Sequence, residues 1–181
     1  VAFPSRSLWH EDGFMGKYTQ IVILCEDRQQ EVFARHFLVT CGVNRRRIHT
    51  KIAPKGLGAA EKYVRKAYPA EVQGYRARCQ HLNIALAVLI DADKSSAEDR
   101  LRQLEDYLSE QSLSPRQPDE KIGIFVPKRN IETWFHYLQG ESVNEVDVYS
   151  KFHNESECKP LVADLAKKRH MPLPDDAPSS L

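Results

Sequence analysis

The sequence lacks the features that define several classes of protein. Its longest strongly apolar run, around Ile84 to Ile90, is far too short to span a bilayer. The 181 residues contain no G-x-x-x-x-G-K-[ST] loop, so they include no P-loop ATPase module. The four cysteines lie far apart without a C-x-x-C pair, which argues against a dense disulfide framework. We therefore expect a cytoplasmic protein with reduced thiols and no membrane segment.

The sequence also lacks an excess of either charge, because 26 Lys and Arg residues nearly balance 25 Asp and Glu residues. The two signs are nevertheless separated along the chain. Residues 28–78 contain 12 basic and 3 acidic side chains, whereas residues 91–164 contain 9 basic and 16 acidic ones. The basic segment suggests contact with a nucleic-acid backbone, and the alternatives are two solvated faces or attraction between copies of the chain in a homo-oligomer. The residues expected to contact DNA or RNA are Arg45, Arg46, Arg47, Lys51 and Lys55.

Apolar runs typical of buried parallel strands alternate with segments whose apolar residues recur at helical spacing. Strands are expected at 21–25, 47–53, 83–90 and 122–126, and helices at 29–39, from 59 to about 68, after 95 and after 130. Such alternation implies right-handed βαβ crossovers. The sequence therefore predicts an α/β fold, in which an open, mainly parallel four-stranded sheet has helices on both faces.

The same pattern suggests how the chain is divided. We expect an N-terminal extension at 1–17, the sheet-containing domain at 18–140, a helical appendage at 141–170 and a mobile tail at 171–181. Two helix starts carry specific signals. Ser95 to Glu98 matches the S-x-x-E capping box, and Asn130 is expected to be the N-cap of the last helix in the domain.

Acidic side chains follow three of the predicted strands, at the point where each strand ends. Glu26 follows the first strand, Asp91 and Asp93 follow the third, and Glu132 lies shortly after the fourth. Ligands of open parallel sheets bind beyond the carboxyl ends of the strands. Several carboxylates at one edge need a counter-charge, and hard divalent cations prefer oxygen ligands. The sequence therefore predicts a magnesium site, with capping of the following helices as the alternative for any single acid.

Other polar residues near these strands have simpler interpretations. Asp27 and Glu31 are expected to be solvated or capping residues. The glycine turn at 54–58, which contains Lys55, is interpreted as a strand-to-helix connection rather than a phosphate cradle. His136 follows Glu132 by one helical turn, but we expect it to lie outside the site.

Three segments together resemble the TOPRIM fold. They are the strand ending in Glu26, the strand ending in Asp91-Ala92-Asp93, and the run Lys128-Arg129-Asn130-Ile131-Glu132-Thr133-Trp134. The resemblance covers residues 18–138 and is strongest to the branch found in overcoming-lysogenization-defect (OLD) nucleases and related phage-defence proteins. The roles it implies are metal ligand or general acid/base for Glu26, metal ligand for Asp91 and Asp93, second-metal ligand for Glu132, and phosphate stabiliser for Lys128.

Two positions depart from the usual TOPRIM pattern. Asp27 stands where the family usually has glycine, and Ser95 stands where topoisomerase-like members often carry a third acid. The second departure favours the nuclease branch. The resemblance therefore implies a nuclease that cleaves DNA or RNA with one or two Mg²⁺ or Mn²⁺ ions. Because OLD nucleases also carry an ATPase module, any ATPase used in antiviral defence would come from a partner protein in trans.

Two other functions fit parts of the same pattern. The run from Ile23 to Asp27 resembles the strand and acidic pair of receiver domains, in which Asp91 would be the phosphoacceptor and Lys128 would follow a later strand. However, the 65 positions between Glu26 and Asp91 exceed the usual interval. The third interpretation is a TOPRIM-like subunit without catalytic activity.

Overall fold

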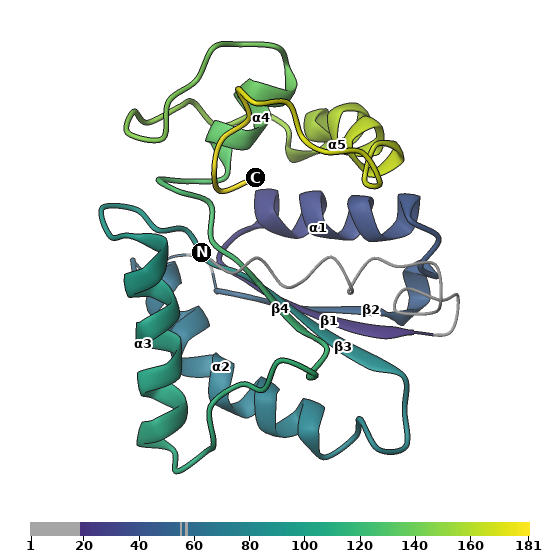
Figure 1. Cartoon of the computed structure of the whole chain (residues 1–181), viewed down its shortest axis with the longest axis vertical. Coiled ribbons are helices and arrows are strands. Elements are labelled where there is room, and N and C mark those ends of the chain that lie inside the picture. The colour runs from purple at the N-terminus through teal and green to yellow at the C-terminus, as the bar shows by residue number, and fades with distance from the viewer. Residues whose placement is uncertain (1–18, 55, 57) are drawn as a thin grey trace.

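The computed structural model describes residues 19–54, 56 and 58–181. Four strands form one open sheet in the order β2-β1-β3-β4, and every neighbouring pair is parallel. Figure 1 shows this sheet between two layers of helices, which confirms the predicted α/β fold. The strands are β1 (Gln20–Cys25), β2 (Ile48–Ile52), β3 (Ile84–Leu89) and β4 (Ile122–Phe125).

Five α-helices cover the two faces of the sheet among the described residues. On one face, α1 (Arg28–Thr40) packs with α4 (Glu132–Leu138) and α5 (Lys159–Lys167). On the other face lie α2 (Ala60–Arg76) and α3 (Ala97–Glu110). Two short 3-10 helices, η2 (Arg45–Arg47) and η3 (Glu155–Cys158), precede β2 and α5.

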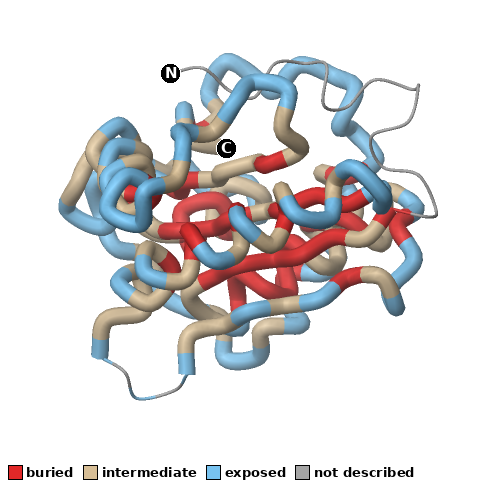
Figure 2. Tube along the Cα trace, turned by 90° about the horizontal axis from the view of Figure 1, so that it is seen from below, coloured by how far each residue is buried: buried red, intermediate tan, exposed pale blue. Residues whose placement is uncertain are grey.

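The central strands are apolar throughout because both of their faces are buried. Alternate residues of β1 point to opposite sides, so Ile21 and Ile23 join the core under α1 while Val22 and Leu24 join the core over α2 and α3. Figure 2 shows this buried centre surrounded by exposed loops and helix surfaces. The long apolar runs are thus the signature of a sheet covered on both faces.

The second helix is longer than the sequence predicted. It was expected to end near Tyr68, and the residue that follows is a proline, which disfavours the helical conformation of the residue before it. In the structure, α2 continues through Pro69 to Arg76. Val72 and Tyr75 extend the buried stripe of Tyr68 beyond the proline. Packing of this stripe against the sheet therefore outweighs the local effect of the proline.

Both predicted helix caps are wrong. The capping box of α3 uses Ser96 and Asp99 rather than Ser95 and Glu98. The motif fits this segment in two ways, with Ser95 and Glu98 or with Ser96 and Asp99, and the structure has the second. At α4 the N-cap position is taken by Ile131, and the side chain of Asn130 instead accepts a hydrogen bond from the Thr133 hydroxyl at 3.4 Å.

The first turn of α1 holds two acids with different roles. Asp27 is the N-cap, as one of its predicted alternatives, and accepts a hydrogen bond from the Gln30 backbone N–H at 3.0 Å. Glu31 is only 1% exposed and forms ion pairs with Arg28 and Arg35. Arg35 also donates to the backbone oxygen of Ile48. Glu31 is therefore neither solvated nor a cap. Its partner Arg35 links α1 to the edge strand β2.

The segment after α4 returns to the sheet-containing domain. α5 packs on α1 through Val162 in the core under α1. In the segment expected to be a mobile tail, Ser180 accepts a hydrogen bond from Trp134 Nε1 at 2.9 Å, and its backbone N–H donates to Glu145 at 3.0 Å. The expected N-terminal extension, 1–17, lies outside the described residues. In the part of the chain that the structure describes, every helix is too short or too polar to cross a membrane.

Candidate functional site

The ends of β1 and β3 are joined by side chains. Glu26 Oε1 accepts a hydrogen bond of 2.6 Å from the backbone N–H of Asp91. Gln30, on the first turn of α1 and completely buried, connects the same two residues. Its oxygen accepts from the Glu26 N–H at 2.9 Å, and its amide nitrogen donates to Asp91 Oδ1 at 2.8 Å. The relative positions of Glu26 and Asp91 are therefore fixed by three hydrogen bonds.

A second pair of acids lies around the ammonium group of Lys151. Lys151 Nζ is 2.7 Å from Asp27 Oδ2 and 3.6 Å from Glu132 Oε1. Glu132 begins α4 and is 1% exposed, and its Oε1 atom has no hydrogen-bond partner among the described residues. Glu132 is thus a buried carboxylate with an oxygen available for a cation.

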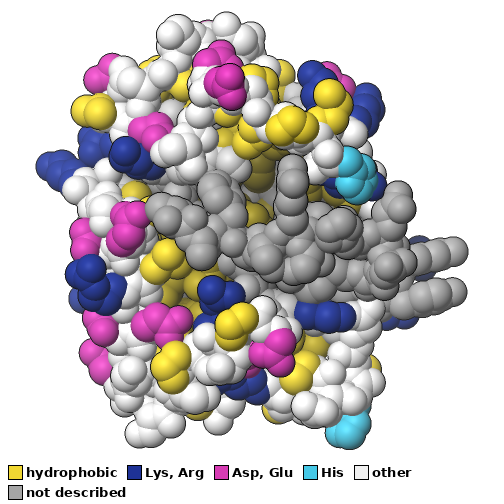
Figure 3. Space-filling view, viewed as in Figure 1, with side chains coloured by type: hydrophobic (Ala, Val, Ile, Leu, Met, Phe, Trp, Pro, Cys, Tyr) yellow, Lys and Arg dark blue, Asp and Glu magenta, His cyan; other side chains and the backbone are white. Residues whose placement is uncertain are grey.

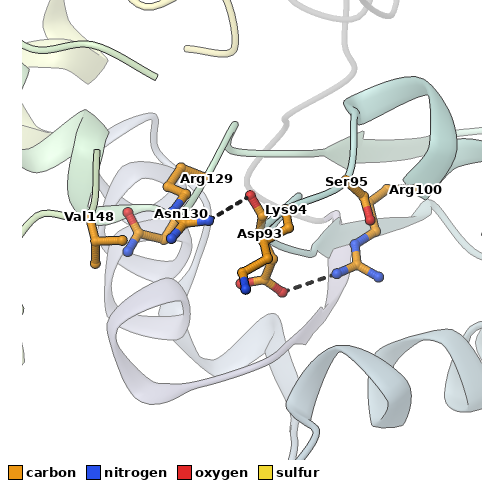
Figure 4. Close-up of a pocket in the computed structure, with 7 residues that line it drawn as sticks. All are labelled: Asp93, Lys94, Ser95, Arg100, Arg129, Asn130 and Val148. Atoms are coloured by element: carbon orange, nitrogen blue, oxygen red, sulfur yellow. Dashed lines mark hydrogen bonds and ion pairs between the residues drawn. The ribbon is translucent and has the colours of Figure 1, made fainter. Parts of the chain in front are cut away.

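Asp93 is paired with an arginine, although its charge still acts on Glu26 and Asp91. Its φ of +55° places it in the left-handed region, so the alternation expected for an extended D-x-D segment does not hold here. Its carboxylate pairs with Arg100 Nη2 at 3.0 Å, as Figure 4 shows. Arg100 is 5% exposed, and its Nε donates to the backbone oxygen of Asp91 at 2.8 Å. Asp93 therefore contacts a buried arginine on α3 rather than sharing an orientation with Asp91.

The loop after β4 forms the far side of an open cavity of about 450 Å³. The backbone N–H groups of Ala92 and Asp93 donate to the carbonyls of Pro127 and Arg129, which holds the two loops together. Lys128, on this loop, is half exposed, and its Nζ is 3.7 Å from Glu145 Oε2. The cavity is lined by Asp93, Lys94, Ser95, Arg100, Arg129, Asn130 and Val148 (Figure 4).

Burial and mutual repulsion raise the pKa values of the carboxylates at the strand ends. Burial raises the pKa of Asp91 well above its usual range, and the charges of Glu26 and Glu132 raise it further. Burial raises the pKa of Glu26 to about 8, although the hydrogen bond from the Asp91 N–H acts in the opposite direction. The pKa of Glu132 is also raised by burial, with partial compensation from Lys151. The site therefore favours protons or other cations at neutral pH.

A cation would have to be held by oxygen atoms from several of these residues. Among the residues that the structure describes, no group of three or more His, Cys, Asp or Glu side chains is already arranged as a metal site. Two contacts account for this, because Asp93 pairs with Arg100 and Lys151 lies at Asp27 and Glu132. The buried oxygen of Glu132 and the raised pKa of Asp91 nevertheless fit a hard divalent cation.

The predicted basic residues lie elsewhere on the sheet. Because β1 and β2 are parallel and Ile21 pairs with Ile48, the arginine triplet 45–47 is at the amino end of β2, opposite the carboxylates. The strand between them spans about 17 Å at 3.3 Å per residue. Lys51 lies on this strand and is 3.7 Å from Glu71, whereas Lys55 lies outside the described residues. On the described surface in Figure 3, basic and acidic side chains are interspersed.

Three residues of the site, Gln30, Arg100 and Lys151, were not predicted from the sequence. Gln30 follows Asp27 by three positions, a D-x-x-Q spacing that matches a capping box, so this signal was present. Arg100 and Lys151 had no such signal, because neither lies in a motif and both reach the site only through the fold. His136 contacts Glu141 and the carbonyl of Ser150, outside the carboxylate group, as expected.

Similarity to other proteins adds nothing to this description. Comparisons of the chain with protein-family models, curated proteins and solved structures gave no match. The interpretation of the site therefore rests on its own geometry and charge.

The raised pKa values predict an unusual dependence of stability on pH. The folded protein keeps a proton on Glu26 up to about pH 8, whereas the unfolded chain releases it near 4.5. The contribution of this neutral group to stability is therefore fully present below pH 4.5 and is lost as the pH rises to about 8. We expect the free energy of unfolding, measured in urea, to fall over this range. The Glu26→Gln variant should show a smaller fall, and an equal fall in both proteins would contradict the assignment.

Proposed function

We propose that the protein is a metal-dependent nuclease that hydrolyses phosphodiester bonds of DNA or RNA. The observation that supports this most directly is the convergence of one buried and two half-buried carboxylates that follow three parallel strands. These carboxylates come from different segments of the chain. The charges of Glu26 and Glu132 both raise the pKa of Asp91. Such a group serves no evident purpose in packing, whereas it suits a cation that binds phosphate.

The ligands of the proposed Mg²⁺ or Mn²⁺ ion are Glu26 and Asp91, with Asp93 joining if it leaves Arg100, and Glu132 would be the ligand of a second ion. Such an ion, when bound, polarises a phosphoryl oxygen and lowers the pKa of a water molecule. The chain itself holds the carboxylates in place, because Gln30 donates to the carboxylate of Asp91 and the backbone N–H of Asp91 donates to that of Glu26. Lys128 is exposed enough to approach a phosphate, and its charge would stabilise negative charge developing there.

The TOPRIM resemblance gives this proposal its biological setting. According to this resemblance, the protein would act as an OLD-type nuclease in antiphage defence. An ATPase partner would then act in trans. The supporting features are the order of Glu26, Asp91-Ala92-Asp93 and Lys128 to Glu132 along the chain and their location at one edge of the sheet.

A cleavage assay tests the nuclease directly. Purified protein is incubated with supercoiled plasmid, linear DNA and single-stranded RNA, with Mg²⁺, Mn²⁺ or EDTA. We expect nicking or degradation of at least one substrate with Mg²⁺ or Mn²⁺ and none with EDTA. Cleavage that persists in EDTA, or no cleavage of any substrate with either metal, would contradict the proposal.

A receiver-like domain is the second candidate, and one observation favours it. The strand order β2-β1-β3-β4 matches the first four strands of the 2-1-3-4-5 sheet found in receiver domains. In that case, Asp91 would accept a phosphoryl group from a small phosphodonor such as acetyl phosphate. The mass of the intact protein would rise by one phosphate, and Asp91→Asn would prevent the increase. The nuclease proposal predicts no such adduct.

The arginine triplet provides a separate test of nucleic-acid binding. A backbone running from η2 along β2 to Glu26 would cover about 17 Å, or about five phosphates per strand at 3.4 Å. We expect replacement of Arg45, Arg46 and Arg47 by glutamine to weaken DNA or RNA binding and to reduce the slope of log K against log salt by about 2 to 3. Fluorescence anisotropy at several salt concentrations measures both quantities.

The matched control for the triplet is a change in basic residues elsewhere. Lys159 and Lys167 lie on α5, so Lys159→Gln/Lys167→Gln removes charge without touching η2 or β2. Binding of Mn²⁺ should remain unchanged in both variants. An unchanged salt slope in the triplet variant would rule out this surface as the path of the nucleic acid.

A further inference from the structure

Lys151 is a residue of the site that no motif predicted. It lies in the loop between α4 and η3, 124 positions after Asp27, yet its Nζ is 2.7 Å from Asp27 Oδ2. The same ammonium group is 3.6 Å from Glu132 Oε1. Asp27 is itself fixed as the N-cap of α1, and Glu132 is fixed at the start of α4. The ammonium therefore lies between acids from two helix starts.

The contact with Glu132 is electrostatic and not a hydrogen bond. A separation of 3.6 Å exceeds hydrogen-bonding distance, and within the described part of the chain the buried Glu132 Oε1 has no hydrogen-bond partner. A buried carboxylate oxygen without a partner is destabilising unless a positive charge compensates it. Lys151 provides that charge, and it is a compact point charge, as a metal ion is.

Lys151 forms its ion pairs with only one half of the carboxylate group, Asp27 and Glu132, although the charge of Asp91 also acts on it. Glu26 and Asp91 make no ion pair with Lys151, and they are connected to each other through Gln30. The burial of Asp91 and the neighbouring charge of Glu26 leave this half without a full counter-charge. A divalent cation placed at Asp27 and Glu132 would meet the ammonium at close range, where two positive charges in a partly buried site repel strongly.

We propose that the ammonium group of Lys151 occupies the position of a second divalent cation, so that the site binds a single cation on the side of Glu26 and Asp91. This inference rests on the proposed metal-dependent function and specifies its number of metal ions. Lys151 thus places one positive charge between Asp27 and Glu132, where a second cation would otherwise lie.

Titration with MnCl₂ by isothermal calorimetry, in the absence of any nucleic acid, tests this inference. We expect one Mn²⁺ per wild-type chain. Lys151→Met keeps most of the side-chain length but removes the charge, so this variant should bind two Mn²⁺ ions. The control is Lys167→Met, because Lys167 is exposed on α5 and pairs with Asp164 away from the site. This control should bind one Mn²⁺ with wild-type affinity.

A second measurement shows whether the substituted chain is folded. Without metal, Lys151→Met should melt at a lower temperature than wild type, because Asp27 and Glu132 lose their counter-charge. Millimolar MgCl₂ should raise its melting temperature more than that of wild type or Lys167→Met. Circular dichroism at low temperature confirms that the variant is folded before each titration.

Several results would overturn the inference. They are two Mn²⁺ ions bound to wild type, none bound to wild type, or one bound to Lys151→Met with unchanged affinity. These results are distinct from failure of the nuclease proposal, which is decided by cleavage. If wild type cleaves but binds two Mn²⁺ ions, only the proposed role of Lys151 is refuted. If Lys151→Met binds two Mn²⁺ ions where wild type binds one, but wild type does not cleave, only the nuclease proposal is refuted.

Discussion

Replacing Asp91 by asparagine is expected to reduce metal-dependent cleavage by about a hundredfold or more. A metal acting as a Lewis acid contributes several kcal/mol to the transition state, and each 1.4 kcal/mol corresponds to about tenfold in rate. Asparagine keeps the oxygen that accepts the hydrogen bond from Gln30 but loses the charge that attracts the cation. Initial rates of plasmid nicking, compared with wild type at saturating Mg²⁺, measure the effect.

The stability of this variant separates lost chemistry from lost structure. Because burial and neighbouring acids raise the pKa of Asp91, removing its charge should leave the folded protein at least as stable as wild type near pH 8. Asp106→Asn, on the exposed surface of α3, serves as the matched control and should retain full activity. An Asp91→Asn protein that cleaves as fast as wild type would refute the nuclease assignment.

Replacing Glu31 by glutamine is expected to destabilise the protein by about 3 kcal/mol, because it removes the charge from two hydrogen-bonded ion pairs, each of which contributes about 1.5 kcal/mol or more. Glu31 is 1% exposed and pairs with both Arg28 and Arg35. In a chain of this size, the loss corresponds to a decrease in melting temperature of about 6 to 12 °C. Urea unfolding and thermal melts at neutral pH measure it.

For Glu26→Gln, five positions before Glu31, we expect no loss of stability near pH 8. Glu26 has no ion-pair partner among the described residues, and burial raises its pKa to about 8. Glutamine keeps an oxygen for the Asp91 N–H, so this variant should be at least as stable as wild type near pH 8. Equal destabilisation by both substitutions would show that the two carboxylates are not distinguished by their charge environment.

Much of the fold could be predicted because its central strands are buried on both faces. The runs Ile21–Cys25 and Ile84–Ile90 are apolar throughout, which is typical of a parallel sheet covered on both faces. Helix ends were less predictable. At Pro69 the local preference and the buried stripe of α2 conflict, and the sequence alone does not tell which is stronger.

Local sequence patterns located part of the candidate site as well. Residues that follow strands of a parallel sheet must share one edge, so the neighbourhood of Glu26 and Asp91 could be predicted from strand positions alone. The direction of Asp93 could not, because it depends on a positive φ and on a buried arginine from α3. Lys151 could not be found either, since its approach to Asp27 depends on how the segment after α4 folds back.

The contacts that build the site join positions far apart in the chain, and this determines when the site forms. Gln30 is 61 positions from Asp91, Glu26 is 65 from the same residue, and Lys151 is 124 from Asp27. Contacts of such separation require the loops between them to close, which costs conformational entropy. A nascent or partly folded chain therefore has scattered, ordinary carboxylates. The acids repel one another only after the folded sheet has brought them close together.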